Sequence, residues 1–529
     1  MAETFALTGS QVPIELFDAG ITLVAPGLVG AGFYHGKREV GQTRAATQEK
    51  GPLDTALAEA GLEDRHTIDI DAPTPEASGT GLVRGKGGLA DDEIELQVAC
   101  APNEIQFVLY SDEDGILSLH IPRATAPLDA LPSRASSTAK LYTYRIQLRR
   151  PTGKGPAGGQ TRGVVGLVVH KLIKIIVGKA LKGVARLGEY AAVKFWEDKA
   201  RGAQGFHGGS VGQFLADPPT SFADWASLEG KRSLLVIHGT TSSTCGAFDG
   251  LKLFPEMADR FWKTYEGRIL GFNHHTLSKR VVENVKDFYA ALADHPGSYE
   301  FDVVTHSRGG LLARALTELP DDEISDLCAT PWRRPANVAI KFRRVMFVGT
   351  PNVGTDLADP KNLPVTLDRL ANAIHMLPDA PLTFALGAVF AAAAYVSETG
   401  LDALPGLVDQ APASQFLTKL NAPKSRSIDV AGYFGIEAEF HPDGGIASAI
   451  LDKGVDRVFR GKANDLIVPT REVTLIASAQ LPPVRVKQYG SADHIYHTSF
   501  FRHLPTWQYI AESLGVDKSG PSRPGHQIS

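Results

Sequence analysis

The amino-acid sequence predicts an α/β protein built on a mostly parallel sheet, preceded by a β-rich N-terminal region. Two observations lead to this fold class. From about residue 231 onward, strand-like apolar runs alternate with helical runs of about ten to twenty residues, a pattern that specifies βαβ units. Between residues 94 and 149, apolar and polar residues instead alternate with a period of two, around a turn that contains Asp114 and Gly115. This second pattern is typical of antiparallel strands.

The first part of the chain, residues 1–150, is the predicted β-rich region. Residues 1–90 are rich in glycine, proline and turn residues, and no individual element is predicted there. Further on, a small β-sandwich or sheet is expected from the runs IELQVAC, IQFVLY, ILSLHIP and LYTYRIQLR. The stretch PTGKGPAGGQ at 151–160 follows them, and its glycine and proline content is typical of a linker.

Residues 151–230 are expected to hold this linker and a long amphipathic helix at 163–200. Four basic residues fall near one side of such a helix, opposite Val, Leu and Ile: Lys171, Lys174, Lys182 and Arg186. One interpretation is a basic helix that makes a peripheral contact with an anionic membrane. The other, which we favour, is a linker helix that packs its apolar face on a neighbouring domain, because amphipathic helices mostly serve cores.

Residues 231–515 form the predicted α/β domain, with an insertion near 360–422, and residues 516–529 form a tail. The alternating strands and helices are expected in the order SLLVIHG, FPEMADRFW, RILGFN, SKRVVENVKDFYAALA, FDVVTHS, GGLLARALTEL, RRVMFVGT, SIDVAGYFGI, VRVKQYG and LPTWQYIAESLG. Strands joined by helices in this way lie parallel in one sheet.

Composition excludes several classes of function. A net charge of −5 argues against nucleic-acid binding, which needs a basic face. Three widely spaced cysteines give neither a disulfide framework nor the spacing of a zinc site, so no metal or other cofactor is expected. The N-terminus has no basic start followed by an apolar block, and no run reaches the ~18 apolar residues of a membrane span, so a cytoplasmic protein is expected. Its oligomeric state is not predicted.

Polar residues follow the predicted strands at the end where the loops of an α/β sheet meet. These loops are residues 238–243, 306–310, 349–355, 464–469 and 493–497. In an α/β sheet, the carboxyl ends of the strands are where reactive groups converge. A serine, an acid and a histidine, in that chain order, therefore lie in loops that are expected to meet.

The sequence resembles the α/β-hydrolase superfamily, and in particular its lipase and esterase branch. The motifs that carry the resemblance are VIHGTTSS, THSRGG, VGTPNVGT, NDLIVP and a late histidine before the last helix, spread over about residues 230–515. The sequence departs from the family at Thr305, where the G-x-S-x-G elbow usually has glycine. Small residues are needed there because the backbone is strained, so the local geometry is expected to differ slightly.

The resemblance implies a Ser-His-Asp triad. Ser307 would be the nucleophile, His497 the general base, and Asp465 the acid that orients the imidazole. The oxyanion would be held by two backbone N–H groups, those of Arg308 and Thr240, with Thr241 the alternative to Thr240. The insertion would be either a mobile lid over an apolar acyl pocket or a helical cap packed permanently on the sheet, and both remain open.

Each assignment has a competitor. Ser307 could be an ordinary helix N-cap rather than a nucleophile. The other candidates for the acid are Asp356, Asp359 and Asp443, and those for the base are His494 and His503.

The function expected is that of a metal-free serine hydrolase that cleaves carboxylic esters, small-molecule or lipid-like, through an acyl-enzyme. The alternatives are an acyltransferase, thioesterase or amidase with the same triad, or a non-catalytic binding or regulatory protein on a hydrolase scaffold.

Overall fold

The fold is taken from a computed structural model of the 529-residue chain. The structure describes residues 3–16, 20–36, 57, 62–72, 89–101, 104–112, 117–120, 140–148, 171–179, 204–209, 211–216, 219–359, 362, 404–422, 432–440, 462–477 and 479–516. Asp443, most of the predicted insertion and residues 517–529 of the predicted tail lie outside these ranges.

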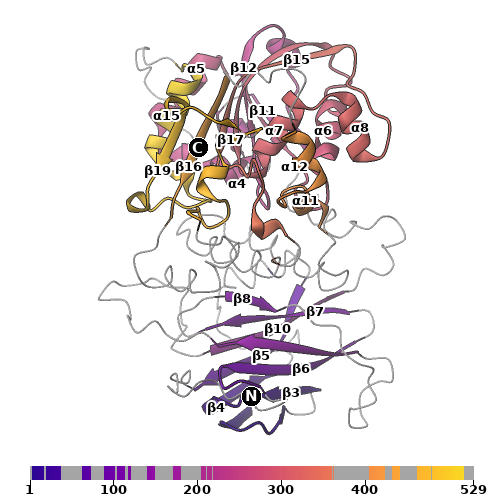
Figure 1. The fold of residues 1–529 in the computed structure, drawn as a ribbon, viewed down its shortest axis with the longest axis vertical. Coiled ribbons are helices and arrows are strands. Elements are labelled where there is room, and N and C mark those ends of the chain that lie inside the picture. The colour runs from indigo at the N-terminus through magenta and orange to yellow at the C-terminus, as the bar shows by residue number, and fades with distance from the viewer. Residues whose placement is uncertain are drawn as a thin grey trace, which may run out of the picture.

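The N-terminal region consists of two antiparallel sheets with a hydrophobic core of their own (Figure 1). The six-stranded sheet has the order β1 (Glu3–Thr8), β4 (Val29–His35), β5 (Leu62–Asp71), β10 (Lys171–Lys179), β7 (Glu104–Ser111), β8 (Leu117–His120). The four-stranded sheet has the order β2 (Ile14–Leu16), β3 (Ile21–Val24), β6 (Glu93–Cys100), β9 (Lys140–Gln147). The strands predicted between residues 94 and 149 are therefore present, and five further strands precede them.

Strand β10 overturns the helix predicted at 163–200 over residues 171–179, and the rest of that range, with Lys182 and Arg186, lies outside the described residues. The strand lies inside the six-stranded sheet, paired with β5 on one side and β7 on the other. Its sequence, KLIKIIVGK, is rich in β-branched Ile and Val, and Ile173, Ile175 and Val177 are buried at every second position. Lys171 donates to the Ala72 carbonyl and Lys174 pairs with Asp64, so these two lysines form no basic face for a membrane.

The larger sheet confirms the predicted α/β class with a mostly parallel sheet. Its order is β11 (Gly205–Gly208), β13 (Ile269–Asn273), β12 (Arg232–Ile237), β14 (Gly297–His306), β15 (Val338–Val348), β16 (Tyr433–Ala438), β19 (Val486–Tyr489). All neighbouring pairs are parallel except β11 with β13. A small hairpin of β17 (Leu475–Ile476) and β18 (Ala479–Gln480) follows β16 in the chain.

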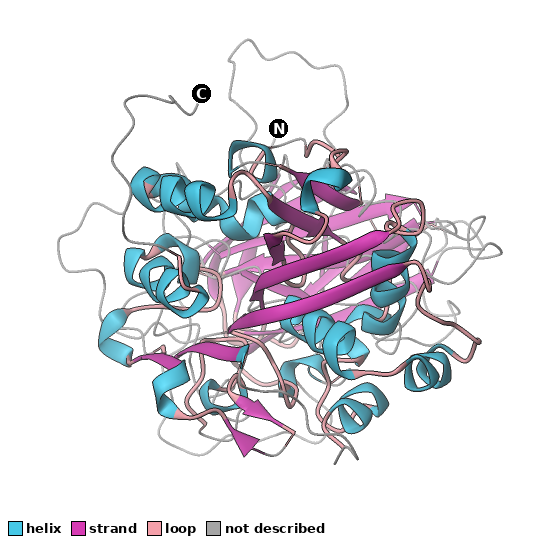
Figure 2. Ribbon diagram, turned by 90° about the horizontal axis from the view of Figure 1, so that it is seen from above, coloured by secondary structure: helices cyan, strands magenta, loops and turns pink. Residues whose placement is uncertain are grey.

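Helices cover both faces of this sheet, and each face has its own core (Figures 1 and 2). One face packs against α5 (Pro255–Tyr265) and α15 (Leu504–Leu514). The other face packs against α6 (Val281–Ala290), α7 (Arg308–Glu318), α8 (Asp321–Cys328) and α12 (Gln415–Leu420). Short helices α3 (Val211–Phe214), α4 (Thr244–Phe248) and α11 (Pro405–Val408) lie in the connections. No helix in the described ranges is long and apolar enough to cross a membrane.

The described end of the predicted insertion, residues 404–422, is packed on the domain. In α12, Phe416, Leu417 and Leu420 are buried in the core beside α7. The rest of the insertion, to which the alternatives of a mobile lid and a fixed cap also apply, lies outside the described residues apart from residue 362. The central strands β12, β14 and β15 end at Ile237, His306 and Val348, which brings the loops after them to one edge of the sheet.

Candidate active site

Ser307 lies on a sharp turn between β14 and α7. It occupies the N-cap position of α7, but its side chain makes no capping hydrogen bond. Its backbone angles are φ 51° and ψ −128°, a conformation that is rare for any residue with a side chain. The ordinary N-cap interpretation is therefore not supported, because an N-cap serine normally has extended angles and bonds to the backbone two or three residues on.

Small residues make this turn sterically feasible. A methyl group added at Gly309 would lie 2.4 Å from the Ile237 carbonyl oxygen, and one added at Gly310 would lie 2.2 Å from Thr350 Oγ1. The departure from the elbow motif at Thr305 is accommodated, because its buried hydroxyl donates to the Met346 carbonyl at 2.9 Å. The threonine side chain is thus hydrogen-bonded to the neighbouring strand β15 instead of crowding the turn.

Asp465 and His497 form a buried hydrogen-bonded pair. The distance between His497 Nδ1 and Asp465 Oδ2 is 2.8 Å, and the two residues are 3% and 1% exposed. The backbone N–H of His497 also donates to the Asp465 carbonyl at 2.9 Å. Two bonds from one residue thus fix both the ring and the backbone of the histidine, and they leave Nε2 as the ring nitrogen that can act on a substrate.

The Asp465 carboxylate is held in place by its own loop. Asp465 Oδ1 accepts the N–H groups of Ile467 at 3.0 Å and Val468 at 2.8 Å. Between Asp465 and Ile467 in the chain, Leu466 has a φ of 86°, a second strained backbone at this end of the sheet. A carboxylate with this many donors is pre-oriented toward the imidazole.

Two contacts bring the elbow and the Asp465–His497 pair together. Ser307 N–H donates to the Val348 carbonyl at 2.8 Å, and a methyl group added at the next residue, Gly349, would lie 3.2 Å from both Asp465 Oδ2 and His497 Nδ1. On the other side of the serine, His306 Nε2 bonds to the His497 carbonyl at 2.8 Å. The serine, acid and histidine predicted from separate loops therefore share one small region.

The loop after β12 lies against the serine. A methyl group added at Gly239 would be 2.6 Å from Ser307 Cβ. Thr241 has a φ of 56°, which is unusual for a β-branched residue, and its N–H donates to Thr276 Oγ1 at 3.1 Å. That bond occupies the N–H of Thr241. The Thr240 side chain is held by Gln410, whose Nε2 donates to Thr240 Oγ1 at 3.2 Å.

The other candidates for the base and the acid have different positions in the fold. His494 is exposed and has a φ of 53°, and His503 is the N-cap residue of α15, with its pKa lowered by partial burial. Asp356 and Asp359 lie in and directly after the short 3-10 helix η4 (Asp356–Ala358), whereas the carboxylate on His497 Nδ1 is that of Asp465. Asp443 lies outside the described residues.

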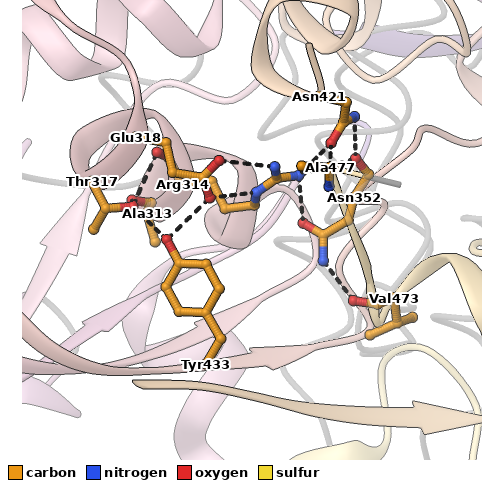
Figure 3. A network of polar contacts seen from close by, with 9 residues as sticks. All are labelled: Ala313, Arg314, Thr317, Glu318, Asn352, Asn421, Tyr433, Val473 and Ala477. Carbon is orange, nitrogen blue, oxygen red and sulfur yellow. Dashed lines mark hydrogen bonds and ion pairs between the residues drawn. The ribbon is translucent and has the colours of Figure 1, made fainter. Parts of the chain in front are cut away.

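A buried ion pair braces the turn beside the site (Figure 3). Arg314 on α7 donates to both carboxylate oxygens of Glu318, at 2.8 and 3.0 Å, and to the Asn352 carbonyl at 3.2 Å. Asn352 Nδ2 reaches the Val473 carbonyl, and Tyr433 on β16 donates to Glu318 Oε1 at 3.0 Å. The network thus joins the helix that follows the serine to the turn at 349–352 and to the segment after Asp465.

Sequence patterns did not single out His306, Gln410 or Arg314. The position of His306 next to the serine is visible in the motif THSRGG, but the direction of its ring is not. No local pattern indicates Gln410, which is 170 residues from its partner Thr240. In the described part of the chain, no group of three His, Cys, Asp or Glu residues is arranged to hold a metal ion.

The comparisons with known proteins give one family and several distant structures. The family described as "Domain of unknown function (DUF7379)" matches residues 210–515, which is more than half of the chain. No curated protein matches.

Among solved structures, lipase 1 from Pelosinus fermentans is 14% identical, with 54% of this chain and 99% of that chain covered and a TM-score of 0.34. EstA from Clostridium botulinum is 13% identical, with 56% and 89% covered and a TM-score of 0.36. The NocB thioesterase domain is 13% identical, with 55% and 97% covered and a TM-score of 0.26. The activity is therefore inferred from the residues of the site.

Proposed function

This chain belongs to the DUF7379 family, and we propose that it is a serine hydrolase of the α/β-hydrolase kind that cleaves carboxylic esters through an acyl-enzyme. The observation that carries the proposal is the position of Ser307 on a strained elbow beside the buried Asp465–His497 pair. The order of serine, acid and histidine in the chain, and their origin in loops after parallel strands, also support it.

In the proposed reaction, the Ser307 hydroxyl attacks the ester carbonyl while His497 Nε2 accepts its proton. Asp465 Oδ2, 2.8 Å from His497 Nδ1, keeps Nδ1 protonated and stabilises the imidazolium that forms. The tetrahedral intermediate collapses, the alkoxide leaves with the proton from His497, and the acyl group stays on Ser307. Water then attacks the acyl-enzyme with the same histidine as base, which releases the acid and restores the serine.

The negative charge on the carbonyl oxygen would be stabilised by two backbone N–H groups, those of Arg308 and Thr240. Arg308 is the first residue of α7, so its N–H also lies at the positive end of the helix dipole. The use of the Thr241 N–H by Thr276 favours Thr240 over Thr241 as the second donor.

A labelling experiment tests the proposal. A fluorophosphonate probe should modify the native protein at Ser307, as read by peptide mass spectrometry, and both labelling and p-nitrophenyl ester hydrolysis should be lost in Ser307→Ala. An unlabelled and inactive wild-type protein with a normal unfolding transition would point to a non-catalytic scaffold. A panel of p-nitrophenyl esters of increasing chain length, with and without a primary alcohol or amine as acceptor, then separates hydrolysis of long and short esters from acyl transfer.

A further inference from the structure

Both proposed oxyanion donors are tied to one short piece of chain, residues 406–410, which lies in the described end of the predicted insertion. We propose that this segment is a bridge that fixes the spacing between the N–H groups of Thr240 and Arg308, with Gln410 as its positioning residue. The inference rests on the proposed function, because it concerns the oxyanion site of that reaction.

Gln410 makes the contact with the first donor. Its side chain is 4% exposed, and its Nε2 donates to Thr240 Oγ1 at 3.2 Å and to the Gly406 carbonyl at 3.0 Å. Its backbone carbonyl accepts the N–H of Thr355 at 2.9 Å, which fixes the main chain from the opposite side. A buried amide with partners on its side chain and its backbone has one orientation, so it holds the Thr240 side chain in one place.

Arg308, whose backbone N–H is the second donor, contacts the bridge through its side chain. Its side chain is fully buried, and its Nε donates to the same Gly406 carbonyl at 3.1 Å. Its Nη2 donates to the Lys279 carbonyl at 2.7 Å. One carbonyl oxygen therefore accepts a hydrogen bond from the side chain of Arg308 and one from the amide that holds Thr240.

The bridge is itself anchored to the domain. Asp409 is completely buried, and its carboxylate accepts from Arg280 Nη2 at 2.8 Å and from the Val281 N–H at 2.7 Å, at the start of α6. The N–H of Gly406 donates to the Leu277 carbonyl at 3.0 Å. These anchors attach the bridge to the start of α6, the helix that packs beside α7. The position of the bridge relative to Ser307, which precedes α7, is therefore fixed.

The consequence is specific to the transition state. An oxyanion donor stabilises charge only when it lies at hydrogen-bond distance from the oxygen, and a displacement of about 1 Å costs on the order of a hundredfold in rate. Loss of the Gln410 contact should therefore lower kcat and leave KM nearly unchanged, because the ground-state ester needs little from this loop.

The test compares Gln410→Met, which keeps the volume but loses the donor, with Gln415→Met, the same change at an exposed position five residues on. We expect kcat of Gln410→Met to fall about ten- to a hundredfold, with KM within about threefold of wild type. Affinity for a trifluoromethyl ketone, which forms a tetrahedral oxyanion on the serine, should fall by the same factor as kcat/KM. Gln415→Met should match the wild type in all three.

A second variant keeps the test informative if Gln410→Met folds poorly. Thr240→Val removes the hydroxyl that Gln410 holds but keeps the Thr240 N–H, so it should give a similar loss that is not additive with Gln410→Met. The proposed bridge would be contradicted if Gln410→Met kept kcat and ketone affinity within twofold of wild type. A raised KM alone would contradict it as well. Failure of the proposed function would look different, because the wild-type protein would then neither hydrolyse esters nor take the fluorophosphonate label.

Discussion

His306 Nε2 donates a hydrogen bond of 2.8 Å to the backbone carbonyl of His497. Because a carbonyl only accepts, Nε2 carries the ring proton. Burial, together with the nearby His497, lowers the pKa of His306 to about 3, so the ring stays neutral. The ring centroids of the two histidines also lie 4.9 Å apart. The residue before the proposed nucleophile thus holds the backbone carbonyl of the proposed base, while Asp465 holds its ring and its backbone N–H.

This relationship predicts that His306 is a positioning residue. His306→Phe should lower kcat about tenfold with little change in KM, because His497 loses one of the bonds that set its distance from Ser307. His306→Gln, whose amide can donate to the same carbonyl, should recover most of the rate.

The measurement that separates positioning from general destabilisation is proton NMR of the His497 Nδ1–H. Its downfield resonance should broaden or shift in His306→Phe and return in His306→Gln. Equal kcat in His306→Phe and wild type would contradict the prediction.

The Asp465–His497 pair predicts a large effect of Asp465→Asn on rate and a small one on stability. The amide no longer enforces the Nδ1–H tautomer, so kcat should fall on the order of 10³-fold or more. Its oxygen can still accept from the N–H groups of Ile467 and Val468, so the melting temperature should change little. Asp356→Asn and Asp443→Asn, assayed in parallel, are the comparison. An active Asp465→Asn beside an inactive Asp443→Asn would reassign the acid.

Gly310 and Thr350 are predicted to be sterically coupled. A methyl group at Gly310 would meet Thr350 Oγ1 at 2.2 Å and Thr350 Cγ2 at 2.5 Å, so Gly310→Ala should destabilise the protein by about 1–3 kcal/mol. Because the obstacle is a side chain, Thr350→Gly should restore part of that loss in the double variant. Gly309→Ala meets the backbone oxygens of Ile237 and His238, so no such rescue is expected there. Urea unfolding of the four variants measures the coupling, and additive losses for Gly310→Ala and Thr350→Gly would refute it.

The buried Arg314–Glu318 pair predicts an asymmetric response to mutation. Arg314→Met leaves the Glu318 carboxylate buried without its main partner and should cost about 3–5 kcal/mol in the free energy of unfolding. Arg314→Met with Glu318→Leu removes both charges and should recover more than half of that cost. Chemical denaturation gives both values. A double variant that is less stable than the single one would contradict this. It would show that losing the hydrogen bonds to Asn352 and Tyr433 costs more than leaving the Glu318 charge unpaired.

The α/β region could be predicted from sequence because its signals are local. The strands from SLLVI to RRVMFV contain short apolar runs that alternate with helical runs, and Ser307 comes directly after such a strand. The resemblance to the α/β hydrolases then pointed to Ser307, Asp465 and His497; the structure pairs Asp465 with His497, and the catalytic roles of the three stay predictions. The turn at Ser307 was visible for the same reason, since the elbow depends on its immediate neighbours.

What the sequence could not predict depended on partners far away in the chain. The run KLIKIIVGK fits a helix with lysines on one side and a strand with Ile173, Ile175 and Val177 on one face, and only its pairing with β5 and β7 decides for the strand. Within residues 1–90, strands β1 to β4 are three to seven residues long, and the longer β5 (LEDRHTIDID) is mostly polar, so no apolar period is sustained. The contact between Gln410 and Thr240 spans 170 residues, and no periodicity reports such a contact.

The last prediction concerns acid stability and His207 on the edge strand β11. This side chain is 1% exposed, and burial lowers its pKa to about 4. Its Nδ1 bonds to the Gly205 carbonyl at 3.5 Å, and its Nε2 has no hydrogen-bond partner among the described residues. Between pH 6.5 and about 4, the unfolded chain therefore binds a proton at this position that the folded chain does not. Stability from His207 is complete above pH 6.5 and is lost as the pH falls, by about 1.4 kcal/mol per pH unit.

Replacing His207 with a residue that does not titrate should remove this contribution. The free energy of unfolding, measured by urea denaturation between pH 7 and pH 4.5, should fall less steeply for His207→Gln than for the wild type, whatever the difference between the two at pH 7. Carboxylates titrate toward the lower end of the same range in both proteins, so the difference between the two slopes isolates the histidine. Parallel curves would mean that His207 is protonated in the folded protein as readily as in the unfolded chain, which its burial in β11 should prevent.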